Sequence, residues 1–175
     1  ASLTISLKAV MNEGEECIVF APYFTEYKVF IENAGGKIVV SNPKEENFFI
    51  DFEDFESKIN EKTRAVIVNS PNNPSGVVYP KDDIETLSKI LEKKSKEYGK
   101  VIYLIADEPY RELVYNGVEV PYLITSTVSS KEVSVSSLFF ASVIFSSLIG
   151  FGLFAAGISI NSNSSGIALI ESFSL

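Results

Sequence analysis

The stretch VNSPNNPSGVVYP, residues 68–80, joins an apolar run to a segment with helical periodicity. The apolar run begins at Ala65, and the helical pattern begins near Pro80. Two adjacent asparagines and two prolines occupy the loop between them, which is more than a simple connection needs. A short apolar strand, a polar loop and an amphipathic helix in this order are typical of a βα unit.

The same alternation extends in both directions from this loop. Short apolar runs predict strands at residues 17–20, 37–40, 65–69 and 101–107. Apolar residues at helical spacing predict helices at residues 2–11, 21–36, 51–59 and 80–98. The pattern therefore predicts an α/β fold, a three-layer sandwich whose mostly parallel sheet is covered by helices on both faces.

Composition excludes several classes of function. The chain has 175 residues, of which 46% are hydrophobic, so it can supply a core. The net charge of −8 argues against binding to a nucleic-acid backbone. Histidine is absent, which excludes Ser-His-Asp triads and zinc sites built on imidazole. The one cysteine, Cys17, lies in a predicted strand, so we expect a buried thiol and a reducing, cytoplasmic compartment.

Two polar clusters follow the third and fourth predicted strands, Asn69–Gly76 and the sequence DEPY that begins at Asp107. Ligands of open α/β sheets bind at the carboxyl ends of strands. A carboxylate at Asp107 is costly to bury without a positive partner, and Tyr110 is close enough along the chain to point into the same space. Each cluster alone also fits a structural role, the first as a tight turn and the second as a helix cap with a packing tyrosine. Asn73 and Asp107 are separated by one helix and one strand.

Together, the two clusters resemble those of a known family. NSPNNPSGVVY followed by IADEPYREL is similar to the class I/II aminotransferases, which are fold-type I enzymes that use pyridoxal phosphate. FAPYFTEY, ENAGGK and TRAVIVNSPNNPSG extend the resemblance over residues 1–122. It implies a partial large domain that transfers an amino group between an amino acid and a 2-oxo acid, and a parent protein that is a homodimer.

The resemblance also implies roles for individual residues. Asp107 is expected to pair with the protonated pyridine nitrogen of the cofactor, which keeps the ring able to accept electrons. Tyr110 and Asn73 are expected to bind the ring 3′-oxygen, and Asn73 also the substrate carboxylate. Phe24 matches the aromatic residue that stacks on the ring, although a core position at a helix start is the alternative. Asn72 matches no such role and is expected to shape the loop.

Two expected parts of the family site do not match this sequence. The loop that holds the cofactor phosphate would fall immediately before Ala1. The lysine that forms the aldimine would fall near Leu138, where the sequence SVSSL contains none. Lys131 is the only lysine after Lys100. It lies too early and is at most a weak candidate, so no catalytic lysine is identified and we expect an inactive fragment.

The character of the sequence changes near Leu123. Residues 123–175 are rich in serine and carry few charges, and residues 138–160 carry none. We expect the α/β pattern to end there and interpret the segment as an aberrant tail produced by a shifted reading frame. The alternative is a non-catalytic α/β domain with a partner-binding or membrane-anchoring tail, since residues 138–160 are long enough to span a bilayer. The lack of a basic flank disfavours the membrane.

Overall fold

A mixed β-sheet forms the centre of the computed structural model, which describes residues 2–44, 47–123, 158–162 and 167–172. Within these residues the strands lie side by side in the order β2-β1-β3-β4-β6-β5. Every neighbouring pair is parallel except β5 and β6. The strands are β1 (Glu16–Phe20), β2 (Lys37–Ser41), β3 (Thr63–Asn69), β4 (Ile102–Asp107), β5 (Ile158–Ser162) and β6 (Ile167–Ser172).

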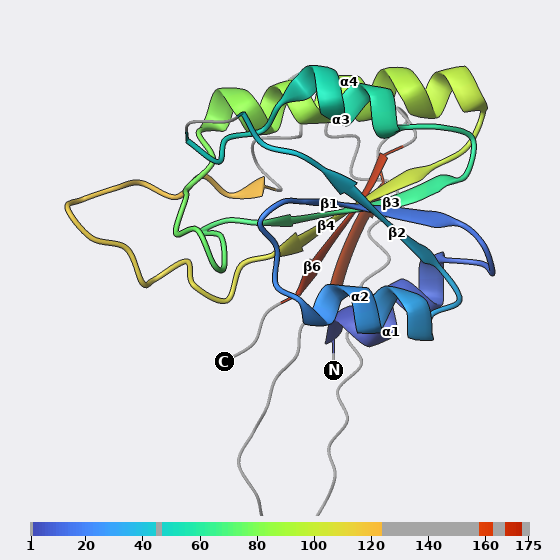
Figure 1. Cartoon of the computed structure of the whole chain (residues 1–175), viewed down its shortest axis with the longest axis horizontal. Coiled ribbons are helices and arrows are strands. Elements are labelled where there is room, and N and C mark those ends of the chain that lie inside the picture. Colours follow the sequence, from blue (N-terminus) through green and yellow to red (C-terminus); the bar gives the residue numbers. More distant parts are fainter. Residues whose placement is uncertain (1, 45–46, 124–157, 163–166, 173–175) are drawn as a thin grey trace, which may run out of the picture.

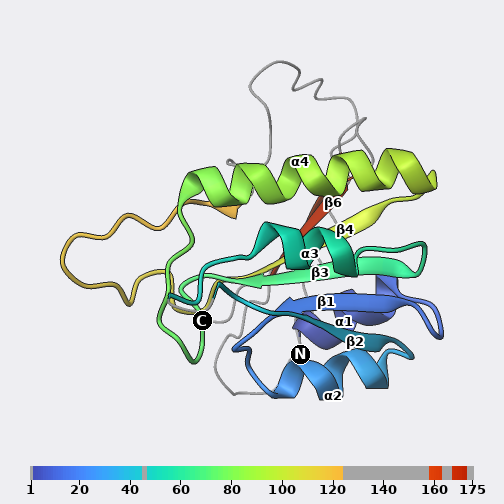
Figure 2. The ribbon, with the colours of Figure 1, turned by 45° about the horizontal axis from the view of Figure 1, so that its top comes forward.

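Helices cover both faces of this sheet (Figure 1). One face carries α1 (Ser2–Val10) and α2 (Glu26–Asn33), and the other carries α3 (Phe52–Lys58) and α4 (Lys81–Tyr98). The second view shows the same layers, with α4 lying along the sheet above β4 and β6 (Figure 2). The predicted three-layer α/β sandwich with a mostly parallel sheet is therefore confirmed.

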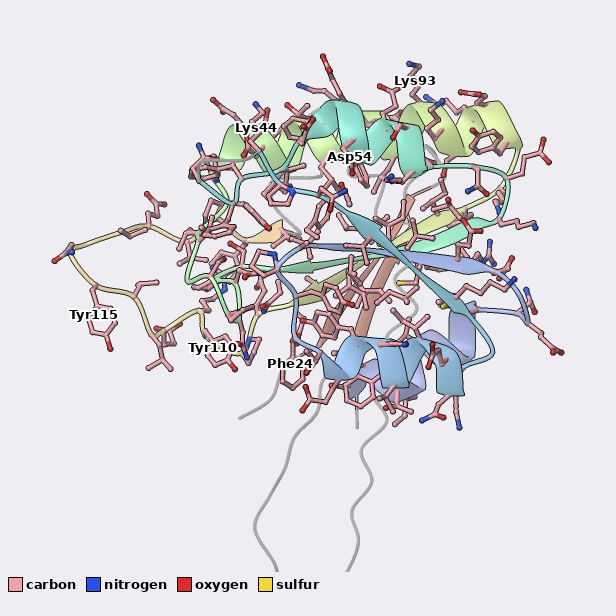
Figure 3. All side chains as sticks on the ribbon, viewed as in Figure 1. Phe24, Lys44, Asp54, Lys93, Tyr110 and Tyr115 are labelled. Carbon is pink, nitrogen blue, oxygen red and sulfur yellow. The ribbon has the colours of Figure 1, made fainter. Side chains whose placement is uncertain are left out.

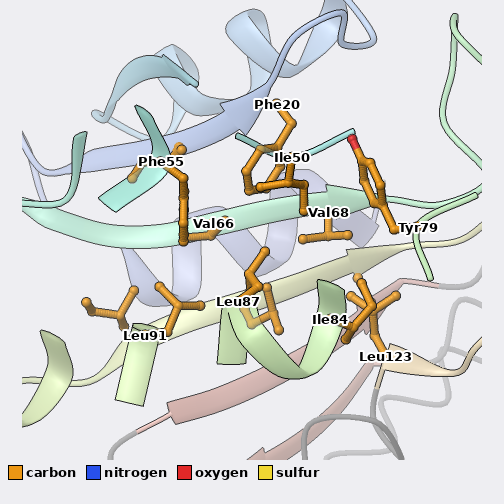
Figure 4. Close-up of a cluster of buried hydrophobic side chains, with 14 of the residues drawn as sticks. Phe20, Ile50, Phe55, Val66, Val68, Tyr79, Ile84, Leu87, Leu91 and Leu123 are labelled. Atoms are coloured by element: carbon orange, nitrogen blue, oxygen red, sulfur yellow. The ribbon is translucent and has the colours of Figure 1, made fainter. Parts of the chain in front are cut away.

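Each face of the sheet has its own hydrophobic core. Beneath α3 and α4, buried side chains from β1, β3 and β4 meet both helices (Figure 4). Phe20 and Phe55 pack there with ring centroids 5.2 Å apart. Beneath α1 and α2, Cys17 and Ile67 are buried against the other two helices. Alternate residues of a strand point to opposite faces, so near-continuous apolar strands supply both cores.

The helix boundaries follow from local chemistry. The carboxylate of Asp51 accepts hydrogen bonds from the backbone amides of Glu53 and Asp54, at 3.0 and 3.2 Å, and so caps the start of α3. Helix α4 begins at Lys81, so Pro80 occupies the capping position and not the first helical position expected for it. Gly99 ends α4 with φ of +63°, a left-handed conformation that glycine adopts without a steric penalty.

The expectation that the α/β pattern ends near Leu123 is wrong in one respect. Strands β5 and β6 come from the segment after residue 122, and β6 pairs in parallel with β4 over Ile102–Asp107. The sequence of this segment predicts no helix with a charged face, but ISINS and IALIES carry the branched residues that favour strands. Residues 158–160 of the uncharged run belong to β5, and residues 138–157 lie outside the described part. No helix within the described residues is long and apolar enough to cross a membrane.

Candidate functional site

The carboxyl ends of β3 and β4 bring the two polar clusters together. Asn69 and Asp107, the last residues of these strands, are direct partners in the parallel register. The side chain of Asn69, only 5% exposed, donates a hydrogen bond to the backbone carbonyl of Asp107 at 2.7 Å. Its carbonyl oxygen accepts a hydrogen bond from the backbone amide of Asn73 at 2.6 Å. One buried amide therefore connects both clusters, a role that sequence reasoning did not assign to Asn69.

The side chains of Asn73 and Tyr110, both expected to bind the ring 3′-oxygen, contact each other. The amide nitrogen of Asn73 donates a hydrogen bond to the Tyr110 hydroxyl at 3.0 Å. Both side chains are partly buried, and they come from the loops that follow β3 and β4. In this contact Asn73 uses one of its two amide hydrogens, and the Tyr110 hydroxyl acts as acceptor. The second amide hydrogen of Asn73 and the hydroxyl hydrogen of Tyr110 can therefore both be donated to one ligand atom placed between the two side chains.

Asn72 shapes the loop that carries Asn73. Its side-chain oxygen accepts hydrogen bonds from the amide and the hydroxyl of Ser75, at 3.0 and 2.6 Å. Its backbone amide donates to Val77 O at 2.9 Å, and its carbonyl accepts from Gly76 N at 2.8 Å. Gly76 has φ of +74°, which a residue with a side chain adopts only with strain. The predicted structural role of Asn72 is confirmed.

Asp107 has a partner that the sequence did not reveal. The hydroxyl of Tyr27, on α2, donates a hydrogen bond to Asp107 Oδ2 at 2.5 Å. Tyr27 is only 2% exposed, and burial raises the pKa of its phenol far above the ordinary value, with the negative charge of Asp107 adding to the shift. Tyr27 therefore stays a neutral donor. In sequence, it is only one of the residues of the helix predicted at residues 21–36.

Phe24 lies beside this pair at the same edge of the sheet. Its ring contacts the Tyr27 ring edge-to-face, with centroids 5.6 Å apart and an interplanar angle of 81°. It follows β1 as Tyr110 follows β4, and Figure 3 shows both side chains at the end of the sheet toward which these parallel strands run. The structure thus brings Phe24 to Asp107 through Tyr27.

A cavity of about 530 Å³ opens between the loops that follow β3 and β4. This volume lies within the range of pockets that bind small molecules. Asn73 and Tyr110 contribute polar atoms to it. Its described lining includes no lysine or arginine and is otherwise mostly apolar, with Pro71, Pro74, Val78, Leu113, Val114, Tyr115 and Val118 among its residues.

Arg111 connects the parts of the segment that follows β4. Its guanidinium forms an ion pair with Glu108 at 2.7 Å and donates to the backbone carbonyls of Val120 and Pro121, at 2.7 and 3.0 Å. It also lies 3.7 Å from the ring centroid of Tyr122. A guanidinium has five N–H donors, so it can bind several groups of one loop at once. The role of Arg111 is structural, and the sequence analysis did not identify it.

The remaining predicted positions are not placed by the structure. Lys131, the weak candidate for the aldimine lysine, lies outside the described residues, and so does Leu138. Ala1, next to which the phosphate-binding loop was expected, is also outside them. The roles predicted for these positions stay predictions.

Comparisons with known proteins identify the family. A family model described as aminotransferase class I and II matches residues 1–138. An aspartate aminotransferase from Bacillus sp. strain YM-2 is 36% identical over 113 residues, which are 64% of this chain and 27% of that protein. An aspartate/prephenate aminotransferase from Thermus thermophilus is 39% identical over 111 residues, 63% of this chain and 27% of that one.

Solved structures agree with the sequence matches. An amino transferase from Eubacterium rectale superposes with a TM-score of 0.70 at 52% identity, covering 71% of this chain and 32% of that one. The aspartate aminotransferase of Thermus thermophilus with maleate gives a TM-score of 0.63 at 36% identity, covering 71% and 31%. The chain therefore spans about a quarter of the length of the curated relatives and under a third of these structures.

Proposed function

The chain belongs to the class I and II aminotransferase family, and from that premise we propose that it forms part of the large domain of an aminotransferase. The proposed parent transfers an amino group between an amino acid and a 2-oxo acid. Members of this family depend on pyridoxal phosphate. The proposal rests on the hydrogen bonds at the carboxyl ends of β3 and β4, which we call the polar edge. There, Asn69 connects Asp107 to Asn73, and Asn73 in turn binds Tyr110.

The donors and acceptors at this edge fit the pyridoxal ring. Asp107 offers a carboxylate to a protonated ring nitrogen, and Asn73 and Tyr110 offer donors to a negatively charged 3′-oxygen. Phe24 supplies an apolar face at the same edge of the sheet. The carboxylate complements the positive charge of the ring nitrogen, and the two donors complement the negative charge of the 3′-oxygen. The residues present therefore fit the cofactor.

When bound, the cofactor supplies an electron sink for the substrate carbon from which a proton is removed. Asp107 contributes by holding a proton at the ring nitrogen, because an anionic carboxylate stabilises a neighbouring cation. Asn73 and Tyr110 orient the ring and stabilise charge at the 3′-oxygen. We propose that Asn73 also binds the substrate carboxylate, because its second amide hydrogen is available at the rim of the cavity.

Binding of pyridoxamine 5′-phosphate tests this proposal, because this form of the cofactor cannot form an imine with lysine. We expect the chain to bind it and Asp107→Asn to weaken the affinity by about 10- to 100-fold, since a hydrogen bond to a charged group contributes about 1.5–3 kcal/mol. Isothermal titration measures both affinities. Asp82→Asn, which removes an exposed carboxylate from α4, serves as the control. Equal affinity for Asp107→Asn and the parent chain contradicts the assignment.

We propose further that this chain does not attach the cofactor covalently. The proposal rests on the lack of a lysine near Leu138 and on the early position of Lys131. After incubation with pyridoxal phosphate and reduction with borohydride, we expect no one-to-one labelling of the chain in its mass spectrum. Stoichiometric labelling that disappears in Lys131→Ala contradicts this proposal and identifies Lys131 as the missing lysine.

Three further properties are proposed for the parent protein. We propose a homodimer in the cytoplasm, supported by the family membership. We also propose that residues 1–122 are large-domain sequence and that residues 123–175 depart from the family, supported by the change in composition at Leu123. The family match ends at residue 138, inside this second segment. Resequencing the coding DNA tests the proposed shift of reading frame, and a clean frame with no neighbouring frame that restores the lysine motif contradicts it.

A further inference from the structure

The buried hydroxyl of Tyr27 is a polar group that none of the roles proposed above uses. It lies in the core between α2 and the sheet, 80 positions from Asp107 in sequence. It donates a hydrogen bond to Asp107 Oδ2 at 2.5 Å, at the short end of the range for hydroxyl donors to carboxylates. A phenylalanine would fill the same space for packing alone. The hydroxyl therefore points to a role at Asp107.

We propose that Tyr27 is a positioning residue that keeps the Asp107 carboxylate ionised and turns one of its oxygens toward the cofactor ring nitrogen. This inference rests on the proposed function. Tyr27 binds Oδ2, which restrains rotation of the carboxylate about its Cβ–Cγ bond. A neutral phenol is suited to this role because it donates without bringing a competing charge.

The surroundings of Asp107 affect the ionisation of its carboxyl group. Ile105 and Ala106 precede it in β4 and are buried, so its carboxylate stands at the mouth of an apolar strand. Burial favours the neutral acid, whereas each hydrogen bond donated to a carboxylate favours the charged form. The Tyr27 hydroxyl supplies such a hydrogen bond from inside the core, where solvent does not compete for it.

The consequence concerns one proton shared by two groups. With Tyr27 donating to Asp107, the proton stays on the ring nitrogen, and a pyridinium cation faces a carboxylate anion. Without that donor, Asp107 binds the proton more tightly, so the N–H bond breaks as an O–H bond forms and both groups become neutral. The total charge of the pair is unchanged. A protonated ring withdraws electrons more strongly, so Tyr27 supports catalysis without touching the cofactor.

The first test uses the chain without cofactor. Carbon-13 NMR of the Asp107 carboxyl group follows its ionisation with pH in the parent chain, in Tyr27→Phe and in Tyr79→Phe. We expect Tyr27→Phe to raise the apparent pKa of Asp107 by about one to two units, because a hydrogen bond to a charged group contributes about 1.5–3 kcal/mol. Tyr79→Phe is the matched control, because Tyr79 is also 2% exposed but lies in the opposite core. An unchanged Asp107 pKa in Tyr27→Phe overturns the proposal.

A reciprocal measurement guards against a Tyr27→Phe chain that does not fold. In Asp107→Asn, we expect the Cζ resonance of Tyr27 to move because its acceptor is no longer charged, while that of Tyr79 keeps its position. An unmoved Tyr27 resonance overturns the proposal in the same way.

The second test reads the ring directly. The chain is saturated with 4′-deoxypyridoxine 5′-phosphate that carries nitrogen-15 in its ring, and the nitrogen shift is recorded at one pH. We expect a pyridinium shift in the parent chain and in Tyr79→Phe, and a move toward the neutral pyridine shift in Tyr27→Phe. The same shift in all three chains overturns the proposal. Failure of the parent chain to bind this analogue overturns the proposed function and the ring-nitrogen role with it, while the carboxyl titration still decides whether Tyr27 controls Asp107.

Discussion

Asn69 connects the two loops of the candidate site through a single side chain. Its amide group donates to the backbone of Asp107 and accepts from the backbone of Asn73. Both partners are backbone groups, so the position of each loop depends on Asn69, whatever side chains the loops carry. A buried group with two satisfied hydrogen bonds is expensive to replace, because removal leaves its partners unpaired.

We predict that Asn69→Ala lowers the free energy of unfolding by about 1–3 kcal/mol and weakens pyridoxamine 5′-phosphate binding. Loss of the side chain removes the present partner of a partly buried amide and of a partly buried carbonyl. Urea denaturation measures the stability and titration the affinity. Asn33→Ala, at an exposed position of α2, is expected to stay within about 0.5 kcal/mol.

Asn69→Asp separates the two hydrogen bonds. It keeps an acceptor for the Asn73 amide but places an anion against the Asp107 carbonyl. We therefore expect it to be at least as unstable as Asn69→Ala at neutral pH and to recover as the new carboxyl is protonated. An Asn69→Ala chain as stable as the parent contradicts the role assigned to this residue.

Helix α4 shows how one element is defined at both of its ends. Its buried residues Ile84, Leu87 and Leu91 face the core below it, which fixes its orientation on the sheet (Figure 4). Gly99 ends it in a left-handed conformation, and the amide of Lys100 then donates to Ser95 O at 3.1 Å. The chain can turn into β4 only because Gly99 adopts this conformation.

We predict that Gly99→Ala lowers the free energy of unfolding by about 1 kcal/mol, because a residue with a Cβ pays this cost in the left-handed region. A Cβ at Gly99 meets no atom within 4 Å, so steric contact with neighbouring residues adds nothing. Gly99→Asn is expected to lose less, since asparagine tolerates this conformation. Urea denaturation of the three chains gives the order, and equal losses for alanine and asparagine contradict this account.

At the scale of the whole molecule, both cores contain a buried tyrosine. Tyr27 lies beneath α1 and α2, and Tyr79 lies beneath α3 and α4. Burial raises the pKa of Tyr79 from 10.0 to about 12, with a smaller contribution from the charge of Asp83. The unfolded chain loses these phenolic protons at lower pH than the folded chain does. Their contribution to stability is therefore complete below about pH 10 and declines as the pH rises above it.

We predict that the free energy of unfolding decreases between about pH 10 and pH 12, and that Tyr79→Phe removes part of this decrease. The sign follows from the raised pKa, because in this window the unfolded chain binds fewer protons than the folded chain. Urea denaturation at several pH values measures the slope. An equal slope in Tyr79→Phe and the parent chain, or greater stability at pH 12 than at pH 9, contradicts the prediction.

The sequence predicted the fold and part of the site because both depend on local patterns and one topological rule. The spacing of apolar residues and the positions of turn-forming residues predict α1 to α4 and β1 to β4. Parallel strands place their carboxyl ends at one edge of the sheet. From that rule alone, Asn73, Asp107 and Tyr110 are predicted to lie at the same edge. The rule could not pair Tyr27 with Asp107, because no local pattern specifies a contact across 80 positions. Strands β5 and β6 were missed for a similar reason, because β6 pairs with β4 far earlier in the chain and β5 joins the sheet only through β6.

The sequence by itself determined the α/β class, the polar edge and the family, since each is encoded in residue types and spacings along the chain. Only the tertiary structure decided which donors reach which acceptors. Hydrogen bonds depend on distances of a few tenths of an ångström and on burial, and both arise when elements distant in sequence pack together. The loop of residues 68–80 can be recognised from its sequence. Two features exist only in the folded chain: the connection of Asn73 to Asp107 through Asn69, and the hydrogen bond from Tyr27 to the Asp107 carboxylate.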